Sequence, residues 1–251
     1  MARIGIIGSG GIARSIASYI ASSDIHSLSF VQGRELDETE FVTATQITDQ
    51  MLHETDIVIE AAHPDAVAKF SEQVLLTCDL MILSCAALVD DSLRDRLTKL
   101  SADCGTSLIV PHGALAGVES YLSSPGKWAS ATIEFVKSPF SLEPVPADTS
   151  ERLVIYDGPV RGIAALYPRN VNAMVTFALA TVGLDECRAR LISDPAAVLG
   201  QLSTKAIGLD GSCLEVFKQQ PMNGVSGTEM ASSVLSSLQS AIEKRSGLIF
   251  G

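Results

Sequence analysis

Paired cysteines are absent from this chain. Its five cysteines are an odd number scattered between residues 78 and 213, and none forms a C-x-x-C pair. Zinc knuckles and disulfide frameworks depend on such pairs, so we expect reduced thiols in or near a core and no metal site. No basic segment with a cleavage site opens the sequence, and no apolar run reaches the roughly 18 residues of a membrane span. We therefore expect a cytoplasmic protein that does not contact membranes.

Charged residues are also sparse. They make up 19% of the 251 residues, and acidic residues outnumber basic ones to give a net charge of −11. This acidic excess argues against nucleic acid as a partner, because DNA and RNA are bound largely through basic side chains. Hydrophobic residues make up 47% of the chain, enough for a sizeable core. A small anionic substrate stays compatible with this charge, since one local basic pocket can bind it.

The first twenty residues carry a dinucleotide-binding pattern. Residues 4–7 form an apolar run typical of a strand, residues 8–13 read G-S-G-G-I-A, and a helical pattern follows. This is G-x-G-x-x-A between a strand and a helix. Gly8 permits the tight turn, Gly10 lets a pyrophosphate approach the backbone, and the helix N-terminus attracts the phosphates. A turn without a ligand is the alternative interpretation.

Strands and helices then alternate as in a parallel, doubly wound sheet. Strands are expected at residues 28–31, 57–62, 80–84 and 107–110. Ligands bind at the carboxyl ends of such strands. We therefore predict that the cofactor is contacted by residues from the first turn and from the end of the third strand: Gly8, Gly10, Gly11, Ile12, Ala61, Ala62 and His63.

The pattern changes after residue 110. Strands are expected at residues 131–136, 188–192 and 206–216, and helices at residues 170–182 and 232–244. The sequence therefore predicts an α/β protein with a Rossmann domain over residues 1–110 and a smaller α+β domain over residues 111–220. The C-terminal segment, residues 221–251, is expected to return to the first domain.

Arg34 indicates which nucleotide is bound. The second strand ends without the Asp or Glu that usually holds the ribose of NAD, and Arg34 follows Gly33 there. A guanidinium pairs with a 2′-phosphate that a carboxylate would repel. This favours NADP, although NAD remains open if Arg34 is only a solvated surface residue and Glu35 or a backbone group serves NAD.

Four stretches resemble the L-aspartate dehydrogenases. Residues 111–117, PHGALAG, are similar to that family's P-S-G-A-[IL]-A-G loop, and residues 167–172, YPRNVN, to its F-P-x-N-x-N. Residues 194–195, DP, and residues 84–88, SCAAL, are similar to its D-P and S-x-G-A-L. The resemblance implies a homodimeric enzyme that oxidises L-aspartate to iminoaspartate with NAD or NADP. It also implies that Ala114 and Asn172 border the nicotinamide.

The chain departs from that family at the catalytic histidine. The family continues after D-P to N-x-H, but no histidine follows residue 112 here. Matching Ile207 and Gly211 to the family pattern puts Ser203 in place of the Asn and Lys205 in place of the His. Lys205 could act as a base if burial lowered its pKa, or could bind a substrate carboxylate.

His112 replaces a serine of the family's nicotinamide loop. Imidazoles titrate near neutral pH, so we predict that His112 and Lys205 are the catalytic residues, with His112 transferring the proton. A hydrogen-bonded loop histidine without catalytic function is the alternative. Lys137, Arg161 and Arg169 are further candidates for binding a carboxylate.

Three functions stay open at this point. The first is an NAD(P)-dependent dehydrogenase or imine reductase for a small amino acid or its keto or imino partner. The second, suggested by the missing histidine, is an NAD(P)-binding homologue with a sensor or partner role. The third is a redox enzyme for a substrate without an amino group, such as a hydroxy acid.

Overall fold

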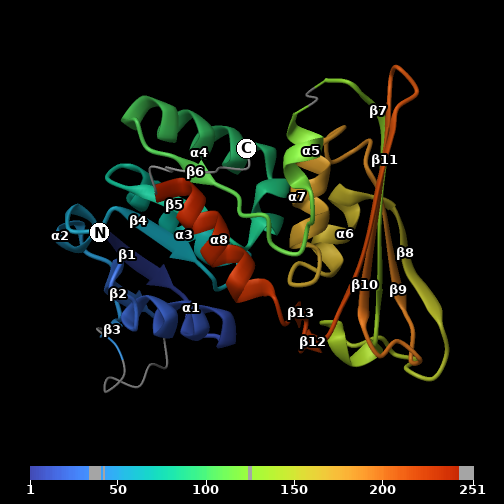
Figure 1. Cartoon of the computed structure of the whole chain (residues 1–251), viewed down its shortest axis with the longest axis horizontal. Helices are drawn as coiled ribbons and strands as arrows, with labels where there is room; N and C mark the ends of the chain where they lie inside the picture. The colour runs from blue at the N-terminus through green and yellow to red at the C-terminus, as the bar shows by residue number, and fades with distance from the viewer. Residues whose placement is uncertain (34–40, 42, 124–125, 243–251) are drawn as a thin grey trace.

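Two large β-sheets organise the molecule (Figure 1). The computed structural model describes residues 1–33, 41, 43–123 and 126–242. The first sheet has the strand order β3-β2-β1-β4-β5-β6, and all of its neighbouring strands run parallel. Its strands are β1 (Ala2–Ile7), β2 (His26–Gln32), β3 (Thr43–Ala44), β4 (Ile57–Glu60), β5 (Asp79–Ile82) and β6 (Leu108–Ile109).

Helices cover both faces of this sheet. They are α1 (Gly11–Ala21), α2 (Asp49–His53), α3 (Pro64–Leu75), the 3₁₀ helix η1 (Cys85–Val89), α4 (Asp91–Cys104) and the C-terminal α8 (Met230–Ile242). The strands β1, β4 and β5 are mostly apolar and buried, as expected when helices cover both faces of a sheet. Val234 and Leu238 of α8 are buried in the same cluster as Ile16 of α1.

The second sheet has the order β11-β10-β7-β9-β8 and is mixed, because β7 and β9 run parallel and the other pairs antiparallel. Its strands are β7 (Trp128–Lys137), β8 (Leu153–Pro159), β9 (Arg188–Ser193), β10 (Gly200–Gly208) and β11 (Cys213–Gln220). The short strands β12 (Met222–Asn223) and β13 (Ser226–Gly227) form a separate hairpin before α8.

One face of the second sheet is packed on helices. These are α5 (Val118–Leu122), α6 (Val160–Leu166) and α7 (Asn172–Ala180), and a 3₁₀ turn η2 (Pro139–Ser141) follows β7. Figure 1 shows the three helices between the two sheets, and no described helix on the other face of the second sheet. Tyr121 and Phe177, both fully buried, pack edge to face in this layer with ring centroids 5.0 Å apart.

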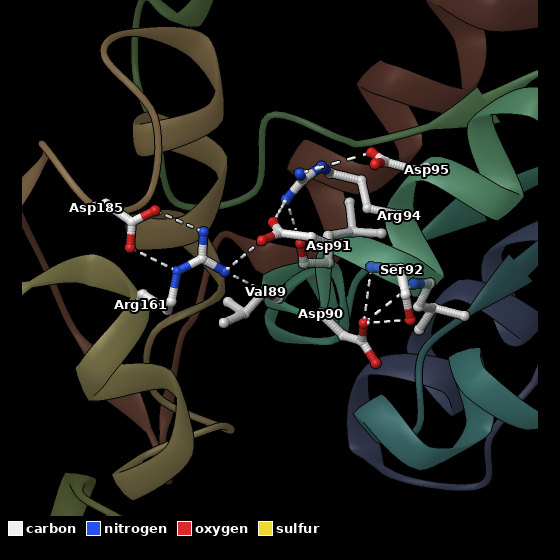
Figure 2. Close-up of polar contacts among 10 residues, drawn as sticks. Val89, Asp90, Asp91, Ser92, Arg94, Asp95, Arg161 and Asp185 are labelled. Atoms are coloured by element: carbon white, nitrogen blue, oxygen red, sulfur yellow. Dashed lines mark hydrogen bonds and ion pairs between the residues drawn. The ribbon is translucent and has the colours of Figure 1, made fainter.

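Arg161 of α6 ties the helix layer of the second sheet to η1 and the start of α4 (Figure 2). Its Nε and Nη2 donate to the carboxylate of Asp185 at 2.6 and 2.7 Å, and its Nη1 donates to the carbonyl of Val89 at 2.7 Å. The same guanidinium pairs with Asp91, at the start of α4, at 3.2 Å. Arg161 is therefore engaged in holding two parts of the chain together.

The predicted fold class is confirmed, and most predicted elements are present. The expected strand over residues 206–216 is instead a hairpin: β10 ends at Gly208, β11 begins at Cys213, and the amide of Gly208 donates to the carbonyl of Ser212 at 2.8 Å. The strand is interrupted at Asp210-Gly211 because Gly211 has a φ of +82°, a value that is found in turns and not in strands.

The described residues include neither a membrane-spanning helix nor a cluster of metal-binding side chains. None of the helices there is long and apolar enough to cross a bilayer. No group of three or more His, Cys, Asp or Glu side chains in that part of the chain could hold a metal ion. Three of the five cysteines are buried, Cys104 and Cys213 are exposed, and all five are free thiols.

Candidate active site

The turn after β1 is held tightly against the end of β4. Gly8 has a φ of +130°, and a Cβ at this position would lie 2.5 Å from the carbonyl oxygen of Ala61. The amide of Gly8 donates to the carbonyl of Gln32 at 2.8 Å, which joins the turn to the end of β2 as well. Only glycine fits this position without moving the neighbouring backbone.

The next glycines of the turn face open space. Gly10 precedes α1 with φ −75° and ψ 175°, and a Cβ at Gly10 or Gly11 would meet nothing within 4 Å. Both glycines are exposed, and Ile12 is half-buried in the first turn of the helix. The start of α1 thus combines an open backbone with the positive end of a helix dipole, the arrangement that binds a pyrophosphate.

A buried carboxylate braces the neighbouring strand ends. Glu60, the last residue of β4, accepts hydrogen bonds from the amides of Ala62 and His63 at 2.8 and 3.0 Å and from the Ser84 amide and hydroxyl at 3.0 and 2.8 Å. Burial raises the pKa of Glu60, and these four donors oppose that shift. Glu60 therefore fixes the loops that follow β4 and β5 relative to each other.

The residues predicted at the end of the third strand lie in the first of these loops. Ala61 and Ala62 directly follow β4, and His63 is the N-cap of α3, where its Nδ1 accepts from the amide of Asp65 at 3.3 Å. Because β1 and β4 are parallel neighbours, these residues and the glycine turn lie at the same edge of the sheet. This edge is where doubly wound folds bind nucleotides.

A partly open cavity lies beside the second sheet. Its walls come from β7, β10, β11, the start of α7, the β12–β13 hairpin and the start of α8. Ala114 and Asn172, the residues expected to border the nicotinamide, both line it. Among the described residues, its lining includes Lys137, Arg169 and Lys218 but no acidic residue and no histidine.

Lys137 is the most deeply buried cation of this cavity, with 7% of its surface exposed. Its Nζ donates to the carbonyl of Val225 at 3.0 Å and lies 5.1 Å from the centre of the Phe135 ring. The salt bridges among the described residues include none at Lys137. Burial lowers the pKa of Lys137 to about 8.

The two other cations of the cavity are paired. Arg169 donates to Glu143 at 2.8 Å, and Lys218 pairs with Glu229 at 2.7 Å. Neither carboxylate belongs to the lining, so the pairs leave the wall itself positively charged. A ligand carboxylate could compete for these cations, because both carboxylate partners are more than half exposed and ion pairs near solvent are weak.

Asn172 links the cavity to η1, the 3₁₀ helix that follows β5. Its side-chain oxygen accepts a hydrogen bond of 3.0 Å from the amide of Ala86 in η1, a residue only 8% exposed.

We expect Asn172→Ala to lower the free energy of unfolding by about 1–3 kcal/mol, because the buried Ala86 amide loses its acceptor. Urea unfolding measures the change. Asn172→Asp keeps an acceptor oxygen and should lose less; equal losses in both variants would contradict this account.

His112 and Ala114 lie on the same loop but line different cavities. His112 lines a second cavity with Gly113, Glu119 and serines of α8, and its Nε2 lies 3.0 Å from Oε1 of Glu119. Its backbone amide donates to Ser237 of α8 at 3.2 Å. The structure thus places His112 beside the cavity of Lys137 without making it part of that wall.

Lys205 lies on the opposite face of the second sheet. Along β10 the neighbours Thr204 and Ala206 are buried toward the helices, whereas Lys205 is exposed and pairs with Glu215 of β11. Alternate residues of a strand point to opposite faces. The structure therefore does not bring the two predicted catalytic residues together, and their catalytic roles stay predictions. Arg34 lies outside the described residues.

Some lining residues were not expected from the sequence. Lys218 and Gln220 at the end of β11 and the hairpin at residues 222–227 reach the cavity only through the fold of the second sheet. The sequence does indicate the face of β7 on which Lys137 lies, because Ile133, Phe135 and Lys137 occupy alternate positions of β7 and the first two are buried. That period of two places Lys137 on the inner face of the sheet.

Comparisons with known proteins agree with this architecture. The family "Aspartate dehydrogenase, C-terminal" matches residues 121–241, and "Homoserine dehydrogenase, NAD binding domain" matches residues 8–111. The L-aspartate dehydrogenase of Serratia proteamaculans is 33% identical over 212 residues, covering 78% of this chain and 80% of the relative. That of Methanosarcina barkeri is 30% identical over 215 residues, covering 78% and 79%.

Among solved structures, the crystal structure of aspartate dehydrogenase from Thermotoga maritima superposes with a TM-score of 0.81 at 23% identity and covers 100% of both chains. A UDP-N-acetylglucosamine 3-dehydrogenase from Acidithiobacillus ferrooxidans gives a TM-score of 0.54 at 14% identity, covering 96% of this chain and 88% of its own. The fold is thus shared over the full length, and the sequence matches place the chain more narrowly: it belongs to the L-aspartate dehydrogenase family of NAD(P)-dependent oxidoreductases.

Proposed function

We propose that this protein oxidises the CH–NH2 group of a small dicarboxylic amino acid, L-aspartate in the first instance, to the imino acid with NADP or NAD. The observation that carries the proposal is the cavity lined by Ala114 and Asn172, whose described wall has three basic side chains and no carboxylate. A dicarboxylate matches that charge. Hydrolysis of the imino acid would give oxaloacetate and ammonia.

The residues present fit a dinucleotide. The open backbone at Gly10 and Gly11 leaves room for a pyrophosphate at the start of α1. We assign Gly8, Ile12, Ala61, Ala62 and His63 to the same binding surface, as predicted from the sequence. When bound, the nicotinamide accepts the hydride that leaves the substrate carbon.

The chain's own side chains bind and orient the substrate in this proposal. Arg169 and Lys218 exchange their present partners, Glu143 and Glu229, for the two carboxylates of the substrate. This exchange is favourable because a charge-assisted hydrogen bond is stronger inside a cavity than at its rim. Asn172 and Ala114 border the nicotinamide and position the substrate carbon against it. The hydrogen bond from the Ala86 amide to Asn172 ties this wall to η1, which follows β5 of the first sheet.

Turnover with oxaloacetate and ammonia tests the proposal. NADPH or NADH oxidation should require both compounds, and aspartate should drive the reverse reaction. Turnover of oxaloacetate without ammonia would instead favour a hydroxy-acid dehydrogenase. Binding of NADPH without turnover on a broad panel of amino and keto acids would favour the second candidate, a sensor or partner protein. The absence of a histidine from the cavity wall is the observation that keeps this candidate open.

We predict that NADP(H) binds at least as tightly as NAD(H), because Arg34 follows the second strand where an acid usually selects NAD. Fluorescence titration of both reduced cofactors measures this. Arg34→Ala should weaken NADPH binding and leave NADH binding nearly unchanged. A clear preference for NADH that Arg34→Ala does not alter would refute the assignment.

We also propose that residues 1–110 and 111–220 form two domains, that residues 221–251 complete the first, and that the protein is a cytoplasmic homodimer. The packing of α8 on α1 supports the domain division. The exposed face of the second sheet, which carries Phe217 with 62% of its surface exposed, is compatible with a partner chain. Light scattering during size-exclusion chromatography measures the assembly, and the mass of a single chain would contradict a dimer.

A further inference from the structure

The cavity contains an acid–base candidate although it contains no histidine. Oxidation of an amino acid needs a base, because the substrate's ammonium must lose a proton before its nitrogen can form a C=N bond. Among the lining residues, Lys137 is the cation without a carboxylate partner, whereas Arg169 and Lys218 are paired with Glu143 and Glu229.

A second buried group points to an ammonium ligand. Gln220 is 8% exposed and lines the same cavity, and its side-chain oxygen has no hydrogen-bond partner among the described residues. A buried acceptor without a donor is costly, so it is expected to receive one from a ligand. The cavity thus offers an acceptor and an amine to a substrate nitrogen.

We propose that the Lys137 side-chain amine is the acid–base residue of this enzyme, taking the proton from the substrate's ammonium while Gln220 accepts a second N–H. This inference rests on the proposed function. An N–H bond of the ammonium breaks and its proton moves to Nζ of Lys137. The freed lone pair forms the C=N bond as the Cα–H bond breaks, and that electron pair leaves as hydride to NADP⁺ or NAD⁺. Imine reduction runs through the same steps in reverse.

The surroundings of Lys137 suit this role. Burial alone lowers its pKa to about 8, so a substantial share of neutral amine exists at mildly alkaline pH. Among the described residues, the charged groups around the cavity are Arg169, paired with Glu143, and Lys218, paired with Glu229. Asp194 after β9 is held by Arg152 at 3.0 Å.

Two substitutions of Lys137 separate a base from a carboxylate anchor. Lys137→Met should lower kcat by about 10²- to 10⁴-fold and remove the inflection near pH 8 from the kcat/KM profile. Lys137→Arg keeps a positive charge but does not lose a proton in this range, so its KM should stay near the wild-type value while its kcat falls as in Lys137→Met. Lys99→Met, at an exposed position of α4, is the matched control.

A stability measurement tests the neutral amine without substrate or cofactor. The folded pKa of about 8 lies below the ordinary value of 10.5. Between these values the unfolded chain binds a proton that the folded chain does not, so the free energy of unfolding of the wild type rises with pH. Relative to Lys137→Met, the wild type should gain stability from pH 8 to pH 10.5 and show no such change below pH 7.

Each failure has its own signature. If both the wild type and Lys137→Arg turn over the substrate at similar rates, Lys137 only binds a carboxylate. That result overturns this inference and leaves the proposed function intact. An inflection that persists in Lys137→Met and disappears in His112→Ala assigns the proton transfer to His112 instead. A flat stability difference above pH 8 overturns the neutral amine. If the wild type turns over no substrate, the proposed function itself fails and the catalytic role of Lys137 fails with it.

Discussion

Gly10→Val should abolish binding of NADPH and NADH while leaving the protein folded. The valine methyl groups would occupy the space beside the start of α1 where the pyrophosphate meets the backbone. Losing two hydrogen bonds to a charged group, about 1.5–3 kcal/mol each, weakens binding on the order of 100-fold or more. Fluorescence titration of the reduced cofactors gives the two dissociation constants.

The fold should tolerate this change. Gly10 is exposed, its φ of −75° and ψ of 175° suit a valine, and a Cβ there meets nothing within 4 Å. The expected stability loss is about 1 kcal/mol or less, since valine is a poorer N-cap than glycine. Ser18→Val, on the exposed side of the same helix, is the control of similar size. Unchanged cofactor affinity in folded Gly10→Val would mean that the turn is only structural.

Gly8→Ala should instead destabilise the fold strongly. The φ of +130° at Gly8 is strained for any residue with a Cβ, at a cost of about 1–3 kcal/mol. The added methyl group would also lie 2.5 Å from the carbonyl oxygen of Ala61, and relieving such overpacking costs about another 1–3 kcal/mol. Both contributions lower the free energy of unfolding, measured by urea denaturation.

The two glycines of one motif thus have separable roles. Gly8 is required by the folded chain itself, because it lets β1 turn while touching the end of β4. We expect Gly10 to be required only by the ligand, because a Cβ there meets nothing within 4 Å. If Gly8→Ala had the stability of the wild type, the backbone of residues 60–62 could move aside at little cost. The close packing of Gly8 against Ala61 would then contribute little to the free energy of unfolding.

For Lys137, the local sequence pattern predicts the face of the strand on which the side chain lies, but not whether the side chain is buried. The alternation in β7 indicates from sequence that Ile133, Phe135 and Lys137 share a face. It does not tell that the face closes against residues 222–230, which lie almost a hundred positions later in the chain. Burial and its effect on the pKa therefore arise only when distant segments meet.

Lys205 shows the opposite outcome. Family spacing aligned it with the catalytic histidine, but the alignment needed an insertion between residues 195 and 203. A shift of one residue along a strand moves a side chain to the other face of the sheet. Spacing alone could not settle that register, and the structure places Lys205 beside Glu215 on the face away from the cavity.

The sequence by itself determined the features set by local geometry. The glycine turn, the alternating strands and helices and the resemblance of residues 111–117 and 167–172 were enough to predict the Rossmann sheet, the dinucleotide and the family. These signals are readable because turn geometry and apolar periodicity depend on residues close together in the chain. Only the tertiary structure decided which cations share a cavity, which are paired and which are buried. Those properties depend on contacts between β7, β11 and the start of α8, and nothing in the local sequence fixes the distance between them.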